Sequence, residues 1–319
     1  MHSPLLGQSV SRLATGLTPE TSYPESLTGP EFFFNLKKEN IKLIVGLVMR
    51  RKAEIMKPIE HNLSVLDRPE VLQYIFYPRR DSYDRPLASN ASNHFIPVEK
   101  NISIGCRFHV AGKEEPNLLF FHGNGEIVGD YDDIASLYNQ RGINFFVADY
   151  RGYGLSGGRP TASALILDGH SILKALKQIL KEKEFSGKLF IMGRSLGSAP
   201  AIDLLASCPE GVAGLIIESG FADTIALLSR IGVSVRDMGF IGGRGFSNLE
   251  KIRSIKHPIL IIHAEDDYII PLADAEKLFS HSSAMKKRLL VIPGANHNDI
   301  LYCGEKEYFQ AIEDFVYER

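Results

Sequence analysis

The pentapeptide Gly193-Arg-Ser-Leu-Gly197 places one serine between two glycines. It follows a short apolar run, Leu189 to Met192, which is too brief for a helix and typical of a buried strand. A segment rich in Ala and Leu, typical of a helix, comes next. A sharp turn between a strand and a helix lifts a serine hydroxyl above the end of a sheet, at the positive end of the helix. We therefore predict that Ser195 is a nucleophile, and the alternative is a tight structural turn.

A serine hydroxyl is a poor nucleophile at neutral pH. It needs a base within hydrogen-bond reach, most often a histidine, and an acid that orients this base. His297 lies in the loop after the apolar run 287–292, near the C-terminus. In open sheets of parallel strands, active sites lie beyond the carboxyl ends of the strands. His297 is therefore the predicted base for Ser195.

Four carboxylates follow late apolar runs, where the orienting acid is expected. They are Glu218, after the run 213–217, and Glu265, Asp266 and Asp267, after the run 258–263. The chain order serine, acid, histidine is the one expected for this type of sheet. Spacing alone leaves the choice among the four carboxylates open.

The loop His122-Gly-Asn-Gly125 follows another apolar run, Leu118 to Phe121. A serine nucleophile needs two backbone N–H groups for the negative oxygen of the tetrahedral intermediate. One usually comes from the residue after the nucleophile and the other from this first loop. These positions predict an oxyanion hole made by Leu196 and Asn124. We expect His122 to orient the loop and not to act as the base.

Composition and the remaining motifs exclude several classes of function. Lys and Arg total 36 against 38 Asp and Glu, so no excess charge favours nucleic acid. The glycine-rich loop 149–158 lacks the Lys-Ser/Thr of a phosphate-binding loop. Three distant cysteines, Cys106, Cys208 and Cys303, fit no metal spacing and leave no full set of disulfides. We expect no cofactor and no metal, and a reducing, cytoplasmic location.

The elements that must position these residues alternate between short apolar strands and helices. The predicted strands are 94–99, 102–110, 118–121, 143–148, 188–192, 213–217, 258–263 and 287–292. The predicted helices in this part are 127–141, 162–184, 197–206, 272–280 and 305–318. Such alternation predicts an α/β fold: a mostly parallel sheet of about eight strands with an antiparallel start and helices on both faces.

Two regions differ from this pattern. Residues 1–86 are predicted to form an N-terminal arm and helical extension, separate from a main domain over 87–319. The predicted helix at 31–58 combines apolar residues with basic clusters. It either docks on the main domain or makes a weak contact with a membrane surface or partner. The insertion 221–256 is predicted to be a short cap over an acyl pocket, and the alternative is core packing of a connecting helix.

Together these motifs resemble the α/β-hydrolase-fold serine hydrolases, and more narrowly the abhydrolase branch of small esterases, protein depalmitoylases and related acyl hydrolases. The resemblance covers roughly 94–319. It rests on 121–125, 149–156, 193–197, 264–271 and 294–297. The acid loop of this family, laid on Ala264 to Pro271, selects Asp267, although Ala264 stands where the family usually has Gly.

The resemblance implies acyl transfer to water through an acyl-enzyme. Ser195 attacks the carbonyl of a small-molecule carboxylic ester or thioester, His297 moves the proton and Asp267 holds His297. The alternatives are a peptidase or amidase, an acyltransferase with the same triad, and a non-catalytic binding protein.

Overall fold

The computed structural model describes residues 63–81, 86–234 and 245–319. Contacts divide the chain into two units, Met1–Ile59 and Glu60–Arg319, and all described residues belong to the second. The predicted arm at 1–30, the predicted helix at 31–58 and residues 235–244 of the predicted cap lie outside the described residues. The predicted boundary at residue 86 stays a prediction. No helix in the described part of the chain is long and apolar enough to cross a membrane.

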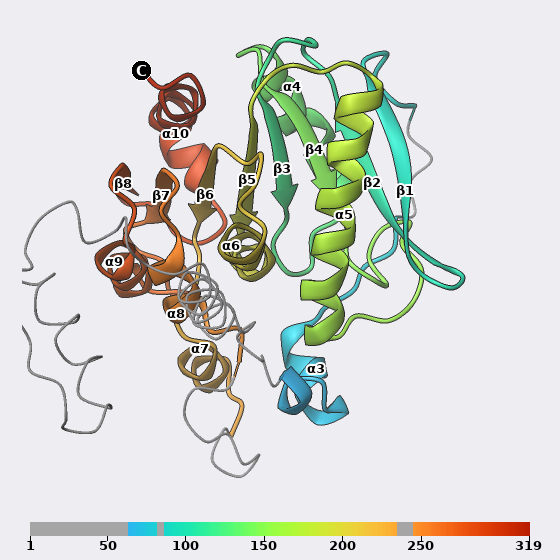
Figure 1. Cartoon of the computed structure of the whole chain (residues 1–319). Coiled ribbons are helices and arrows are strands. Elements are labelled where there is room, and N and C mark those ends of the chain that lie inside the picture. Colours follow the sequence, from blue (N-terminus) through green and yellow to red (C-terminus); the bar gives the residue numbers. More distant parts are fainter. Residues whose placement is uncertain (1–62, 82–85, 235–244) are drawn as a thin grey trace, which may run out of the picture. The chain divides into compact units, whose positions relative to one another are not determined.

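Eight strands form one sheet in the order β1-β2-β4-β3-β5-β6-β7-β8 (Figure 1). The strands are β1 (Ala91–Glu99), β2 (Ile102–His109), β3 (Asn117–Phe121), β4 (Asn144–Ala148), β5 (Leu189–Arg194), β6 (Gly214–Glu218), β7 (Ile259–Ala264) and β8 (Lys287–Ile292). β2 pairs antiparallel with β1 and β4, and all other pairs are parallel. The predicted α/β fold, with an antiparallel start and then a parallel sheet, is confirmed.

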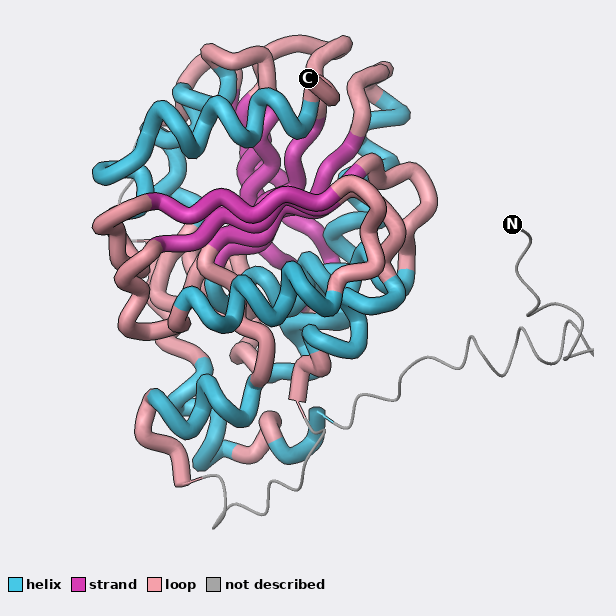
Figure 2. The backbone as a smooth tube through the Cα atoms, turned by 90° about the vertical axis from the view of Figure 1, so that its left-hand side faces the viewer, coloured by secondary structure: helices cyan, strands magenta, loops and turns pink. Residues whose placement is uncertain are grey.

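Helices cover both faces of this sheet (Figure 2). They are α3 (Pro69–Ile75), α4 (Asp132–Asn139), α5 (Ala162–Glu182), α6 (Ser198–Ser207), α7 (Thr224–Arg230), α8 (Asn248–Ser254), α9 (Leu272–His281) and α10 (Ile300–Val316). Short 3-10 helices occupy Leu63–Val65, Val128–Tyr131 and Ser195–Gly197.

Two predicted helices have other boundaries in the structure. The segment predicted as one helix at 127–141 is a 3-10 turn followed by α4. The last helix begins at Ile300 and not at residue 305, and it runs through Gly304, whose φ of −145° and ψ of 39° are not helical. A side chain at Gly304 would place its Cβ 2.6 Å from Ile292 of β8. This close approach explains a glycine inside the helix.

The central strands are buried on both faces. In β3, Leu119 and Phe121 belong to the apolar cluster that includes α5 and α6, whereas Leu118 and Phe120 belong to the cluster with α4 and α10. Strands of this kind are continuous apolar runs in the sequence, which is why they were predictable. The parallel strands all end at one edge of the sheet, and the loops that follow them carry the candidate site.

Candidate active site

Ser195 lies on the turn between β5 and α6, in a left-handed backbone conformation with φ of 52°. The two flanking glycines are needed for close packing. A Cβ at Gly193 would lie 2.2 Å from the carbonyl oxygen of Gly197, and one at Gly197 would lie 2.1 Å from that of Phe121. The predicted strand, sharp turn and helix are therefore present, and the neighbouring backbone segments leave no room for larger residues.

The structure brings Ser195, His297 and Asp267 together from three loops. Oγ of Ser195 is 3.0 Å from Nε2 of His297, and Nδ1 of His297 is 2.7 Å from Oδ2 of Asp267. The three residues are 9%, 4% and 5% exposed. A nucleophile, a base and an acid in this order can activate a serine hydroxyl by proton transfer.

The Asp267 carboxylate is fixed by its own loop. Its Oδ1 accepts the backbone N–H groups of Ile269 and Ile270 at 3.0 and 2.7 Å, which leaves Oδ2 for His297. His263, at the end of β7, packs beside it, with Nε2 at 2.7 Å from the carbonyl of Ile270 and 3.5 Å from Asp267 Oδ2. Burial lowers the pKa of His263. A neutral His263 adds no second positive charge beside the carboxylate.

The other three candidate acids lie elsewhere. The side chain of Glu265 accepts the backbone N–H of Gly294, and Asp266 is exposed. Glu218 is buried at the end of β6, where it accepts hydrogen bonds from Tyr308 and Arg194. Of the four carboxylates, Asp267 is the one bonded to His297.

The two candidate oxyanion residues, Asn124 and Leu196, line the same cavity as Ser195 and His297. The Asn124 side chain is held in place. Its Oδ1 accepts from the backbone N–H of Tyr77 and from the hydroxyl of Tyr153, and its Nδ2 donates to the carbonyl of Ile75. These bonds fix the side chain against the segment after α3, and the backbone N–H of Asn124 stays the predicted oxyanion donor of this loop.

The cavity has a volume of about 350 Å³, and its walls are mainly apolar. Leu227, Leu228 and Ile231, from α7 and its end, form one wall. They belong to the predicted cap. Ile75 and Tyr77 form part of another wall, which the sequence did not indicate because no motif marks the segment after α3. A second cavity, of about 360 Å³, lies near Phe190, Pro258 and Phe315, away from Ser195.

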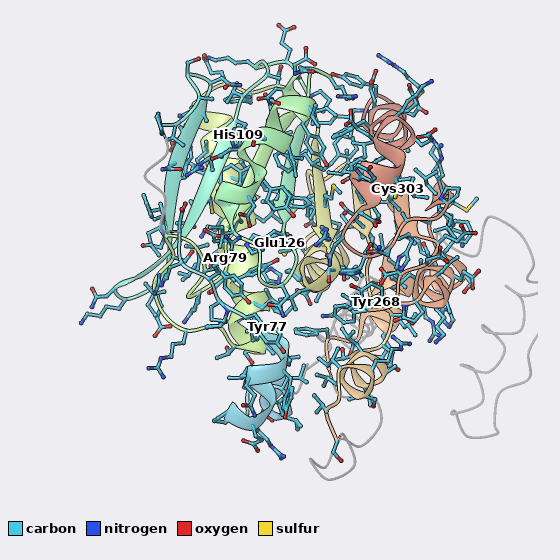
Figure 3. All side chains as sticks on the ribbon, turned by 180° about the vertical axis from the view of Figure 1, so that it is seen from behind. Tyr77, Arg79, His109, Glu126, Tyr268 and Cys303 are labelled. Carbon is cyan, nitrogen blue, oxygen red and sulfur yellow. The ribbon has the colours of Figure 1, made fainter. Side chains whose placement is uncertain are left out.

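Arg194, next to the nucleophile, joins three loops of the site. Its guanidinium donates to the carbonyl of His297 at 2.8 Å, to Asn298 at 3.1 Å and to Glu126. Glu126 in turn accepts the backbone N–H of Gly123 at 2.6 Å, in the oxyanion loop. Figure 3 labels Glu126 and also Arg79, which donates to the carbonyl of Gly125 in the same loop. The sequence marked Arg194 only as a neighbour of the serine.

The two glutamates that contact Arg194, Glu126 and Glu218, have pKa values shifted in opposite directions. Burial raises the pKa of Glu126, but Arg194 and the hydrogen bonds from Tyr131 and Gly123 outweigh it, so the net pKa lies below the usual value. Burial raises the pKa of Glu218 above its usual value, although Arg194 and Tyr308 oppose the shift. Glu126 is therefore the firmly ionised partner of the Arg194 cation.

Within the described ranges, no group of three or more His, Cys, Asp or Glu side chains is placed to hold a metal ion.

A sheet with this strand order, a serine on the turn after β5 and a histidine after β8 define an α/β hydrolase. The chain belongs to the α/β-hydrolase family. Residues 112–237 match the family described as serine aminopeptidase, S33.

Among curated proteins, the chain is similar to protein Bem46 of Schizosaccharomyces pombe, with 32% identity over 65% of this chain and 69% of that protein. It is 31% identical to human alpha/beta hydrolase domain-containing protein 17B, over 69% of this chain and 73% of that protein. Among solved structures, the esterase Pf2001 of Pyrococcus furiosus aligns with a TM-score of 0.64 and 19% identity, over 76% of this chain and 98% of that chain. This last likeness is one of fold.

Proposed function

We propose that this protein is a serine hydrolase that cleaves carboxylic ester or thioester bonds through an acyl-enzyme intermediate. The observation that carries the proposal is the line of hydrogen bonds from Ser195 through His297 to Asp267, at 3.0 and 2.7 Å. The carboxylate of Asp267 can only accept, so Nδ1 of His297 carries the proton and Nε2 is free to accept one from Ser195. This tautomer is the one that a general base needs.

The reaction would proceed in two steps. Ser195 attacks the carbonyl carbon while His297 takes its proton, and Asp267 stabilises the resulting imidazolium. The backbone N–H groups of Asn124 and Leu196 would hold the oxyanion, and one such donor typically contributes about 3 kcal/mol to lowering the barrier. His297 then protonates the leaving alcohol or thiol, and a water molecule repeats the sequence to release the acid.

The cavity supports an acyl group of modest length. Its volume of about 350 Å³ lies near the lower end of the range for small-molecule sites, roughly 300–1,000 Å³. Apolar walls favour a hydrocarbon chain, since burying each CH₂ group contributes about 0.8 kcal/mol. The acyl chain would enter along α7, with its carbonyl beside Ser195.

A chain-length series of p-nitrophenyl esters, the matching acyl-thioesters and a p-nitroanilide tests this proposal. Esters and thioesters should be hydrolysed, with a maximum at a modest chain length. Ser195→Ala should lower kcat by a factor on the order of 10⁶, whereas Ser280→Ala, at an exposed position on α9, should leave it unchanged.

Each other result identifies a rival function. Faster cleavage of the anilide would favour an amidase or peptidase. Transfer of the acyl group to an added alcohol in place of release as free acid would favour an acyltransferase. An equally flat response of the wild type and Ser195→Ala would contradict catalysis and favour a binding protein.

A further inference from the structure

A second cluster of reactive side chains lies outside the candidate active site, where α6 packs against α5 and α8. His170 comes from α5, Asp203 from α6 and Lys251 from α8. Cys208 directly follows the last residue of α6 as its C-cap. The hydrolase mechanism proposed above uses none of these four side chains.

The two contacts of His170 define which ring nitrogen carries the proton when the ring is neutral. Nε2 of His170 is 2.8 Å from Oδ2 of Asp203, and Nδ1 is 3.5 Å from Sγ of Cys208. A carboxylate only accepts hydrogen bonds, so Nε2 carries the hydrogen and Nδ1 of the neutral ring is an acceptor. The thiol of Cys208 is then the donor, and it points its proton at a base.

Asp203 is held firmly in this orientation. Nζ of Lys251 lies 2.7 Å from its other oxygen, Oδ1, and the side chains of Lys251 and Asp203 are 2% and 6% exposed. A fixed carboxylate stabilises the imidazolium that forms if His170 takes the thiol proton. The order acid, histidine, nucleophile is the same as at Ser195, on different elements.

Solvent reaches this cluster. The His170 side chain is 33% exposed and Cys208 is partly exposed. The two other cysteines lie in different surroundings from Cys208. Cys106 is buried, and Cys303 is exposed on α10 (Figure 3), where desolvation first and then the acidic Asp299 raise its pKa. Cys106 is therefore the buried comparison site for Cys208, and Cys303 is the exposed one.

We propose that Cys208 is an activated thiol that hydroperoxides oxidise. His170 takes the thiol proton, and the sulfur attacks one oxygen of the peroxide. An S–O bond forms and the O–O bond breaks, so the sulfur is oxidised to a sulfenic acid and the peroxide is reduced. The departing hydroxide takes the imidazolium proton and leaves as water. His170 and Asp203 are positioning residues that act through the proton of the thiol.

Limited exposure of the full chain to hydrogen peroxide in the presence of dimedone, followed by peptide mass spectrometry, tests the proposal. The dimedone adduct should form at Cys208 about tenfold faster than at Cys303, and not at Cys106. In His170→Gln, the rate at Cys208 should fall to that at Cys303, while the rate at Cys303 stays the same. Cys208→Ser should lose the fast adduct.

Two measurements separate this proposal from a purely structural role for the cluster. Thermal unfolding and ester hydrolysis at Ser195 report whether each variant is folded, and Cys208→Ser should retain both. If His170→Gln unfolds, the rates of adduct formation at Cys208 and Cys303 in the wild type still test whether Cys208 is the more reactive thiol. Oxidation of Cys208 no faster than that of Cys303, or unchanged fast oxidation in a folded His170→Gln, would overturn the proposal.

Discussion

At the scale of single residues, Ser195 occupies a conformation that few residues other than glycine adopt. A left-handed φ such as its 52° costs about 1–3 kcal/mol. The strain persists because β5 and α6 fix the chain on both sides. The glycines at 193 and 197, which have no Cβ, also let neighbouring backbone segments pack directly against this turn. The result is a hydroxyl directed at Nε2 of His297.

The acid loop offers a matched pair of variants. Asp267→Asn replaces a carboxylate that accepts from Nδ1 of His297 with an amide that can donate to it, which favours the wrong tautomer. We expect kcat for ester hydrolysis to fall by a factor on the order of 10⁴. Asp266→Asn changes an exposed neighbour and should leave kcat nearly unchanged. Equal losses in the two variants, with both folded by circular dichroism, would refute the assignment of Asp267.

The sequence predicts the positions of Ser195 and His297 but not the contacts of Arg194, and the difference has a physical reason. Ser195 and His297 each follow a recognisable apolar run, so their loops can be located without a structure. Arg194 bonds to Glu126 and to the His297 carbonyl, which are 68 and 103 residues away along the chain. No local pattern encodes contacts of this range, so the network around Arg194 emerges only from the fold.

At the scale of elements, α7 shapes the cavity. It begins at Thr224 because the side chain of Asp223 accepts the backbone N–H groups of Ile225 and Ala226 at 2.7 and 3.0 Å. The helix then places Leu227 and Leu228 in the cavity wall. The sequence predicted a short apolar segment over an acyl pocket here, but it did not predict that Asp223 begins a helix within this segment or that the helix ends at Arg230.

A bulky residue on α7 should change the acyl-chain preference. Leu227→Trp fills part of the cavity, so KM for long-chain p-nitrophenyl esters should rise several-fold, while KM for the acetate ester stays similar. Leu167→Trp, at a position 65% exposed on α5, is the control for adding an indole. A uniform change across all chain lengths in Leu227→Trp would show that α7 does not line the acyl site.

At the scale of the whole molecule, the segment before β1 contributes to the site. Val71 and Ile75 of α3 are buried in the same cluster as α5 and α6, and Ile75 and Tyr77 reach the cavity. The alternation of strands and helices predicted the sheet and the edge where the loops meet. It did not predict this contribution, because α3 is short and its partners come much later in the chain.

Stability should depend on pH through His109, at the end of β2. Its side chain is 4% exposed, and burial lowers its pKa to about 4, although Asp132 opposes and Arg107 adds to the shift. The unfolded chain, with a histidine pKa of about 6.5, therefore binds this proton first as the pH falls. As the pH falls from 6.5 to 4, protonation of His109 should therefore lower the free energy of unfolding by about 1–3 kcal/mol.

Urea unfolding at pH 7 and pH 4.8 measures this effect. His109→Gln should show a smaller loss of unfolding free energy than the wild type, whereas His281→Gln, on α9, should behave like the wild type. The same loss in all three proteins would show that His109 is not the source.

The central claim is that Ser195 is the nucleophile, and labelling with a fluorophosphonate followed by peptide mapping tests it most directly. The account predicts one adduct, on Ser195, which is absent in Ser195→Ala and forms more slowly in Asp267→Asn. An adduct on another serine of the wild type, or no adduct at all in folded protein that hydrolyses esters, would contradict it.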